Sequence, residues 1–321
     1  MKEIGCYLEL EQNRGSEFHS SGIALNSARN CLRYLIRARK IKKIWLPKFL
    51  CSVISDTCLE ENVDISYYPV DISLTPIFSH IEDPEDYVYF INYYGQYSND
   101  EIRAFSKKYS NLIVDNVQAF YTPPIKGLDT IYTCRKFFGV PDGAYLYTDC
   151  ILTESIPYDK SYDRLAFLAG RLECSANEFY NLNIKNENLI DSLPLRKMSK
   201  LTHNMLRGVD YGYVKKCREQ NFKFLHKRLK TVNQLNIVLP PGPYMYPLLL
   251  KQCNKIREKL LKMKIYIPTL WKNIIKNLPA DDIEYKLAKN ILPLPCDQRY
   301  GKGGEMEYIV QLILEEMTAK H

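Results

Sequence analysis

Short apolar runs that alternate with helix-like segments are the feature of this sequence that most limits its fold. The runs are rich in aliphatic and aromatic residues and are bounded by glycine, proline and aspartate, which predicts short, buried strands. Segments with helical apolar spacing separate them, and this order predicts a mainly parallel sheet with right-handed crossovers. The predicted strands of this part lie at residues 44–46, 64–70, 87–94 and 112–115, and the helices between them at 51–61 and 99–109.

The stretch from Leu112 to Tyr147 brings two reactive side chains to strand ends. The apolar run 112–114 ends in Asp115, and a second β-like run ends in Arg135 and Lys136 before a turn that contains Gly143. In open α/β sheets, ligands bind beyond the carboxyl ends of the strands. Pyridoxal phosphate is one cofactor that needs both groups, because a lysine attaches it and an aspartate keeps its ring nitrogen protonated.

The same pattern also fits ordinary structural roles. An aspartate at a strand end is more often a helix cap or an ion-pair partner, and Lys136 is one of 44 basic residues. The spacing by itself is therefore weak evidence for a cofactor site.

The same stretch resembles the DegT/DnrJ/EryC1/StrS family of pyridoxal-phosphate-dependent sugar aminotransferases, and specifically a shorter subgroup found among surface-polysaccharide genes. The family strand end (I/V)-x-D-x-x-Q-A matches residues 113–119, with Asp115 and Gln118 at the polar positions. The family lysine follows a Ser or Thr and precedes a glycine turn, and here Thr133 precedes Lys136 and Gly143 follows it. The resemblance covers nearly the whole chain, including a Leu-Pro motif at 292–300.

The resemblance implies the α/β fold of the fold-type I aminotransferases, with a large domain whose mainly parallel sheet is sandwiched by helices and a small C-terminal α/β domain. We expect the large, cofactor-binding domain at 1–205, and the small domain with its connecting helix at 206–321. Further helices are expected at 162–180, 198–206, 213–229, 254–262, 284–289 and 305–317, and further strands at 246–250 and 264–267. Residues 1–20 are expected to form an ordered arm in which Tyr7, Leu8 and Leu10 are available for packing.

The resemblance also implies an activity. Lys136 would bind pyridoxal 5'-phosphate covalently and would move a proton as general base and acid once its amine is free. Asp115 would pair with the ring nitrogen, and Gln118 would hydrogen-bond the ring oxygen. The amino donor would be an amino acid, usually glutamate in this family, and the acceptor a keto sugar on a nucleotide diphosphate. A branch of the family that dehydrates sugars carries histidine at the lysine position, and Lys136 argues against that branch.

The phosphate and the face of the cofactor ring are assigned by resemblance to four further residues. Thr133, with backbone amides near Ala28 and Arg29, would hold the phosphate, since the first turn of a helix capped by Asn26 or Ser27 offers free N–H groups. Cys51 occupies the slot of the aromatic residue that the family stacks on the ring. The residues themselves are also consistent with an ordinary capped helix carrying a solvated Arg29, and with a buried structural thiol at Cys51.

Further departures from the family pattern leave the activity open. The family has histidine at the position of Asn92, and near Leu195 it has an asparagine that reaches the phosphate of the neighbouring subunit. The alternative function is accordingly a catalytically weak relative that binds pyridoxal phosphate or a sugar nucleotide as a regulator or scaffold. Family members form dimers with sites at the subunit boundary, so a homodimer is expected.

Charge and cysteine usage limit the partners. A formal net charge of +7 suits an anionic ligand such as a nucleotide diphosphate sugar. A nucleic acid is the alternative, but the basic residues are spread along the chain and mixed with acids. The ten cysteines form no Cys-x-x-Cys pair and the five histidines no His-Glu-x-x-His motif, so no metal site is expected.

The N-terminus and the overall hydropathy predict the location. Acidic residues stand where a signal peptide would need an apolar core, and no apolar run approaches the length of a membrane span. We expect a cytoplasmic protein with reduced thiols and no membrane partner.

Overall fold

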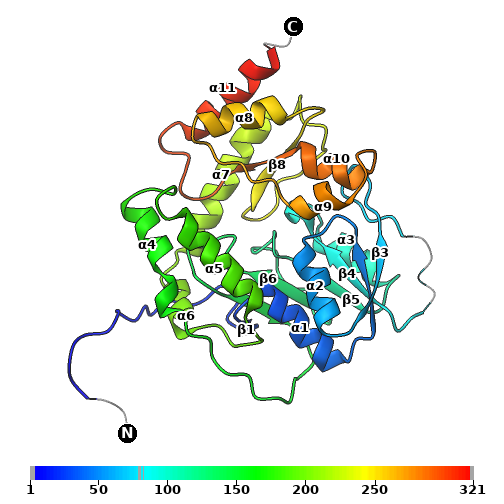
Figure 1. The fold of residues 1–321 in the computed structure, drawn as a ribbon, viewed down its shortest axis with the longest axis vertical. Helices are drawn as coiled ribbons and strands as arrows, with labels where there is room; N and C mark the ends of the chain where they lie inside the picture. The colour runs from blue at the N-terminus through cyan, green and yellow to red at the C-terminus, as the bar shows by residue number, and fades with distance from the viewer. Residues whose placement is uncertain (1–3, 79–80, 82, 319–321) are drawn as a thin grey trace.

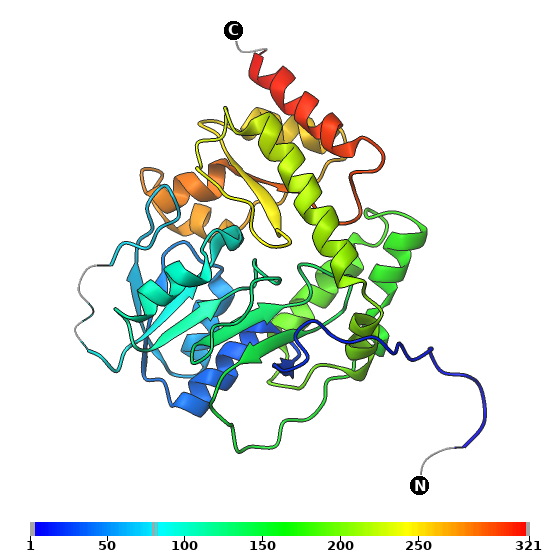
Figure 2. The same cartoon turned by 180° about the vertical axis from the view of Figure 1, so that it is seen from behind.

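A computed structural model describes residues 4–78, 81 and 83–318 of the chain. Within these residues the strands form a seven-stranded sheet and a separate two-stranded sheet. In both views the larger sheet and its helices occupy one end of the molecule, and β8, α8, α10 and α11 occupy the other (Figures 1 and 2).

The larger sheet has the strand order β1-β7-β6-β5-β4-β2-β3. The strands β3, β2, β4, β5 and β6 run parallel; β7 pairs antiparallel with β6, and β1 pairs antiparallel with β7. The prediction of a mainly parallel sheet is therefore confirmed. The bounds are β1 Ile23–Leu25, β2 Lys43–Pro47, β3 Asp64–Tyr68, β4 Tyr87–Ile91, β5 Leu112–Asp115, β6 Asp129–Thr133 and β7 Ala144–Tyr147.

Helices α1 (Ala28–Arg39), α2 (Ser52–Glu60) and α3 (Asn99–Ser106) follow β1, β2 and β4. Helix α1 begins where predicted, because the Ser27 side chain accepts a hydrogen bond from the Asn30 N–H. All residues of α1 from 29 to 36 are buried, and the helix packs against β6, β7 and α2. A single-turn 3-10 helix, η1 (Tyr93–Gly95), follows β4.

The segment after β7 is helical, but it is divided differently from the prediction. A single helix over 162–180 is wrong: η2 (Tyr162–Arg164), α4 (Ala166–Glu173) and α5 (Tyr180–Ser192) replace it. The chain turns back between α4 and α5, and the Phe179 ring packs against Gly170, where a Cβ would lie only 2.2 Å from the ring. Contact of this partly buried aromatic ring with α4 favours the turn over continuation of the helix.

Two further helices, α6 (Lys200–Arg207) and α7 (Tyr211–Leu229), lead to the smaller sheet. Strands β8 (Met245–Leu249) and β9 (Ile291–Pro295) pair antiparallel there. The remaining helices are α8 (Asn254–Lys262), α9 (Lys272–Asn277), α10 (Ile283–Asn290) and α11 (Glu305–Thr318). The predicted strand at 264–267 is wrong, because the partner that β8 pairs with is the Leu-Pro segment at 291–295.

One hydrophobic core joins the two sheets, since buried residues of the parallel strands and of β8 and β9 belong to the same cluster. Trp271 packs edge-on against Phe49 with 4.4 Å between ring centroids. Nearby, the Asn273 side chain donates a 3.0 Å hydrogen bond to the Leu50 carbonyl. The predicted division after residue 205 falls within α6 and stays a prediction.

The N-terminal arm differs from the expectation. Its described part runs away from the body in both views (Figures 1 and 2). Tyr7, Leu8 and Leu10 are exposed instead of packed. In the part of the chain that the structure describes, no helix combines the length and the apolar character needed to cross a membrane.

Candidate functional site

The carboxyl ends of the parallel strands meet at one edge of the sheet and gather the candidate residues. Asp115, the last residue of β5, stands in register with Ile91 of β4 and Ile131 of β6. Thr133 ends β6, and Lys136 follows in the turn beyond it. Neighbouring parallel strands thus present an acid and an amine at the edge where α/β sheets bind ligands.

Asp115 is a buried carboxylate held by two donors. It is 3% exposed, its Oδ1 accepts a 2.8 Å hydrogen bond from the Val117 N–H, and its Oδ2 accepts one of 2.8 Å from the Tyr89 hydroxyl. Burial raises the pKa of Asp115, while the positive charge of Lys136 and the two hydrogen bonds oppose that rise. The carboxylate is therefore fixed in orientation and depends on a neighbouring cation for its ionised form.

Lys136 lies in a turn in which the N–H groups of Phe137 and Phe138 both donate to the Cys134 carbonyl. Its side chain is accessible to solvent. Even so, desolvation by the surrounding protein lowers the pKa of the amine, the charge of Arg135 lowers it further, and Asp115 raises it. The structure thus brings Lys136 and Asp115 into one electrostatic environment, and the amine is easier to deprotonate than an ordinary lysine.

An aromatic ring that the sequence did not indicate flanks this amine. The Lys136 Nζ lies 5.6 Å from the centroid of the Tyr244 ring, a distance at which a cation interacts with the ring face. Tyr244 comes from the segment just before β8, more than a hundred residues along the chain. The only signal near it in the sequence is the run Pro240-Pro241-Gly242-Pro243, which indicates a break between elements.

Cys51 comes close to the same amine from another element. Cys51 is the residue before α2 and is partly exposed. Burial raises the pKa of its thiol, while the charges of Lys136 and Arg29 lower it. The thiol therefore lies near both cations, as a residue beside a shared ligand would.

Arg29 is not the solvated side chain that its position on a capped helix suggested. It is 8% exposed, and its guanidinium donates to Asp191 of α5, with one bond of 2.8 Å to Oδ1 and another to the main-chain carbonyl. Its Nε is buried and has no hydrogen-bond partner among the described residues. A buried donor without an acceptor is costly, so this nitrogen marks a place for an acceptor group.

Several more donors of this site have no protein acceptor or only a distant one. Within the described residues the backbone N–H groups of Ala28 and Arg29 make no hydrogen bond, because they are in the first turn of α1. Gln118 Oε1 accepts a 2.7 Å bond from the Tyr94 N–H, and no hydrogen bond of its amide nitrogen is found there. The Thr133 hydroxyl is buried and lies 3.5 Å from the Gly143 carbonyl.

Asn92 and Leu195, which differ from the family pattern, both make contacts with other residues of this chain. Asn92 is fully buried, and its amide donates to Asn116 and to the Tyr97 carbonyl. Leu195 packs in the hydrophobic core of the chain, and the next residue, Arg196, pairs with the buried Asp159 at 3.2 Å.

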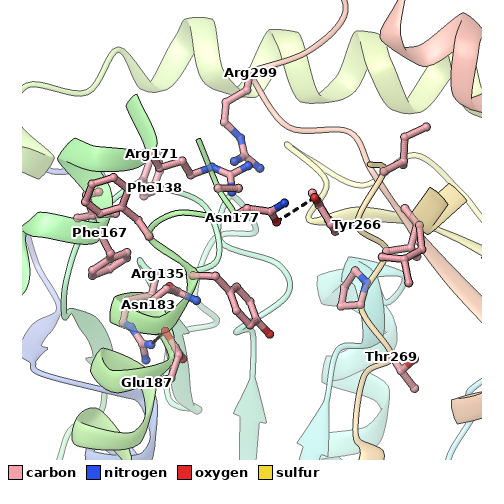
Figure 3. A pocket seen from close by; sticks show the side chains of 18 of the residues that line it. Arg135, Phe138, Phe167, Arg171, Asn177, Asn183, Glu187, Tyr266, Thr269 and Arg299 are labelled. Carbon is pink, nitrogen blue, oxygen red and sulfur yellow. Dashed lines mark hydrogen bonds and ion pairs between the residues drawn. The ribbon is translucent and has the colours of Figure 1, made fainter. Parts of the chain in front are cut away.

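A cavity of about 740 Å³ adjoins the lysine, since Arg135 and Phe138 on either side of Lys136 line it. Figure 3 shows its walls: α4 and α5 form one side, and the segment with Tyr266 and Thr269 forms the other. The Tyr266 hydroxyl donates a 2.9 Å bond to Asn177 across the cavity. The lining combines cations with aromatic rings: Arg135, Arg171, Arg257, Arg299 and Lys272 with Phe138, Phe167, Phe179, Tyr180 and Tyr266.

Glu187 of α5, a residue that the sequence pattern did not indicate, is the acid of this lining. It forms an ion pair with Arg135. Arg171 and Lys272 make no ion pair or hydrogen bond within the described residues. The cavity therefore carries positive charge that is not neutralised. In the described part of the chain no group of three or more His, Cys, Asp or Glu side chains could hold a metal ion.

Comparisons with known proteins agree with this architecture. No protein-family model and no curated protein sequence matches the chain. Among solved structures, the sugar aminotransferase CalS13 from Micromonospora echinospora is 13% identical, with a TM-score of 0.60 over 91% of this chain and 86% of that one. A DegT DnrJ EryC1 StrS aminotransferase from Brucella abortus is 13% identical, with a TM-score of 0.57 over 91% and 85%.

A third structure has the same fold and a different activity. The E. coli GDP-4-keto-6-deoxy-D-mannose-3-dehydratase with bound hydrated PLP is 13% identical, with a TM-score of 0.61 over 91% of this chain and 87% of that one. The expected fold, that of the fold-type I aminotransferases, is thereby confirmed. Identities this low establish the fold alone.

Proposed function

We propose that this protein is a pyridoxal-phosphate-dependent sugar aminotransferase. It would transfer an amino group from an amino acid, glutamate by family resemblance, to a keto sugar linked to a nucleotide diphosphate. Its setting would be surface-polysaccharide synthesis in the cytoplasm. The observation that carries the proposal is the position of two groups at the ligand-binding edge of this fold: the buried Asp115 carboxylate ends β5, and the Lys136 amine follows just beyond the end of the neighbouring strand β6.

The donor set fits the cofactor. Pyridoxal phosphate has a cationic ring nitrogen, a ring oxygen and a phosphate, which require an acid, a donor and several N–H or O–H groups respectively. The acid is Asp115, the unused donor is the amide nitrogen of Gln118, and the phosphate donors are the free amides of Ala28 and Arg29 with the Thr133 hydroxyl. The buried Nε of Arg29, which lacks a partner in the described chain, also suits a nearby anion.

Each residue has a defined task in this proposal. Bound pyridoxal phosphate supplies an aldehyde that accepts amines and a ring that accepts electrons. The neutral Lys136 amine would act as general base and then as general acid, taking up a proton at Nζ and releasing it from there to a different atom, a role that its lowered pKa favours at neutral pH. Asp115 would hold the ring nitrogen and keep it positive, and Cys51 would contact the ring in place of an aromatic residue.

The cavity beside Lys136 supports a nucleotide-linked sugar as the acceptor. Guanidinium groups bind diphosphates through paired hydrogen bonds, and aromatic rings stack on bases. Arg171 and Lys272 have no ionic partner in the described chain, so they are free to take the diphosphate. The dehydratase with the same fold makes dehydration the second reaction to consider, and the lysine at position 136 favours transamination.

A homodimer is part of the proposal, and unpacked apolar side chains support it. Tyr7 and Leu8 of the arm are 88% and 90% exposed, and Leu172 at the end of α4 is 87% exposed. Exposure of this extent in several large apolar side chains suits a surface that another chain covers. Light scattering on the purified protein would give twice the mass of one chain, and a single-chain mass would refute this part.

The decisive experiment is covalent trapping of the cofactor. The purified protein is incubated with pyridoxal phosphate, scanned for the absorption band of the lysine-bound cofactor, reduced with borohydride and digested for mass spectrometry. We expect the label on Lys136 and its loss in Lys136→Ala, with Lys126→Ala, an exposed lysine elsewhere, unchanged. A label spread over surface lysines, with no absorption band, would refute cofactor binding.

A turnover assay distinguishes an active aminotransferase from a catalytically weak relative that only binds the cofactor or a sugar nucleotide. The loaded protein is mixed with glutamate and other amino acids, and then with a panel of nucleotide keto sugars. We expect amino transfer with at least one pair and a loss of roughly 10²- to 10⁴-fold in Lys136→Ala. Specific labelling of Lys136 without reaction with any amino acid would favour the binding-only alternative.

A further inference from the structure

Arg218 is a buried cation that makes no ion pair within the described chain. It lies in α7, is 2% exposed, and is the largest of the fully buried side chains. Its guanidinium stacks on the Phe137 ring, with 4.7 Å between its Cζ and the ring centroid. Removing a guanidinium from water costs free energy unless hydrogen bonds to its N–H groups replace those to water. The partners of these N–H groups therefore show what Arg218 holds in place.

The donors of Arg218 are directed at backbone carbonyls around Lys136. Nη2 donates to the Phe137 carbonyl at 3.1 Å, and Nη1 donates to the carbonyls of Pro243 at 3.0 Å and Tyr244 at 3.2 Å. Nε donates to Gln298 Oε1 at 3.0 Å. Gln298 in turn donates from Nε2 to the same Phe137 carbonyl at 3.0 Å, which closes a ring of hydrogen bonds.

These carbonyls belong to the two segments that flank the amine. Phe137 is the residue after Lys136, and Tyr244 carries the ring that lies 5.6 Å from the Lys136 Nζ. We propose that Arg218, with Gln298, is a positioning residue that fixes the Lys136 amine against the Tyr244 ring by holding the Phe137 and Tyr244 carbonyls together. The inference rests on the proposed role of Lys136 and adds two residues from helix α7 and the Leu-Pro motif to it.

A lysine cannot replace this arginine. Lysine would keep the positive charge, but its single ammonium cannot reach carbonyls on two segments and Gln298 with fixed planar geometry. Loosening the two segments would expose the Lys136 amine further to water. Since desolvation is the main cause of the lowered pKa of Lys136, the pKa should then rise towards its ordinary value.

The charged and titratable groups around Lys136 and Arg218 also influence the pKa values of these two side chains. Around Lys136 they are Asp115, Cys51, Arg135 and Glu187, and around Arg218 they are Asp297, Cys296, Tyr121 and Tyr244. None of these residues is altered in Arg218→Lys. A change in the titration of Lys136 in that variant would therefore report the positions of the segments and not a change of charge.

The test is the pH dependence of borohydride trapping of pyridoxal phosphate on Lys136, followed by peptide mass spectrometry in wild type and Arg218→Lys. We expect the pH of half-maximal labelling to move upward by about half to one unit in the variant. Gln298→Leu removes the second donor to Phe137 without a change of charge, so it should shift in the same direction and less. Arg164→Lys, a buried arginine that pairs with Asp159 elsewhere, is the matched control and should not shift.

The outcomes separate the inference from the proposed function. If wild type labels Lys136 and Arg218→Lys labels it with an unchanged pH midpoint, while only its melting temperature falls, Arg218 is merely structural and the inference is overturned. If wild type does not label Lys136 at all, the proposed function itself fails. Should Arg218→Lys not fold, Gln298→Leu decides the question by the same midpoint.

Discussion

The Tyr89 hydroxyl of β4 donates a 2.8 Å hydrogen bond to Oδ2 of Asp115, the last residue of the neighbouring strand β5. Both side chains are buried, and an unpaired polar group in such surroundings costs more free energy than one in water. It orients the carboxylate and helps to keep it ionised. The pairing therefore links the packing of the sheet to the acid that we assign to the cofactor ring.

Tyr89→Phe tests this link. Loss of the donor should raise the pKa of Asp115 further and cost about 1–2 kcal/mol of unfolding free energy. Affinity for pyridoxal phosphate, measured by absorbance titration, should fall about tenfold, which corresponds to about 1.4 kcal/mol. Tyr68→Phe is the control, because the buried Tyr68 hydroxyl donates to the Tyr89 carbonyl and not to the acid. Equal affinities in the two variants would contradict the assignment.

The cationic cavity should select the acceptor substrate. Arg171→Ala removes a guanidinium that has no protein partner in the described chain, so stability should change by less than about 0.5 kcal/mol. Calorimetric affinity for a nucleoside diphosphate should fall roughly tenfold. Arg103→Ala, which removes an exposed arginine paired with Asp100 on α3, should leave that affinity unchanged. An unchanged affinity in Arg171→Ala would place the diphosphate elsewhere.

His19 should make the fold sensitive to acid. It is 2% exposed, its Nε2–H donates to the Phe120 carbonyl at 2.7 Å, and Nδ1 accepts from the Tyr147 hydroxyl at 3.2 Å. Burial lowers its pKa from 6.5 to about 4. Because the unfolded chain binds a proton that the folded chain excludes, stability is full above pH 6.5 and falls as the pH drops towards 4, by about 3 kcal/mol.

His19→Gln checks this contribution by denaturant unfolding at a series of pH values. Glutamine can still donate to a carbonyl and accept from a hydroxyl, but it does not titrate. The variant should therefore lose less stability than wild type between pH 6.5 and 4. Parallel curves for the two proteins over that window would show that His19 is not the group responsible.

Gly143 in the turn after Lys136 should tolerate no side chain. Its φ is +115°, and a Cβ there would lie 3.0 Å from Thr202 and 3.3 Å from the Cys134 sulfur. Gly143→Ala should cost about 2 kcal/mol or more of unfolding free energy through strain and crowding. Gly139→Ala in the same loop is the control, since its Cβ would meet only Leu168 at 3.7 Å. Equal melting temperatures for the two variants would contradict this.

Local features of the fold could be predicted well from the sequence. Strands β2, β4 and β5 follow from short apolar runs that are bounded by turn residues, and α1 follows from a capping serine before an apolar face. The sequence around 264–267 could not show that this segment is not a strand. An apolar run becomes a strand only where a neighbouring strand is available for backbone hydrogen bonding, and β8 pairs with residues 291–295 instead. The break between α4 and α5 depended in the same way on where the Phe179 ring found its contact.

The candidate site also contains residues that could be predicted from the sequence and residues that only the structure shows. Asp115 and Lys136 could be named from the residue pattern, because each ends a β-like run and the ends of parallel strands share one edge of the sheet. Only the folded chain shows that the Tyr244 ring and Glu187 lie near this lysine, and that Arg218 holds the carbonyl of the next residue, Phe137. These three residues come from α5, α7 and the segment before β8, and tertiary packing brings those elements to the turn after β6, which no local pattern of residues encodes.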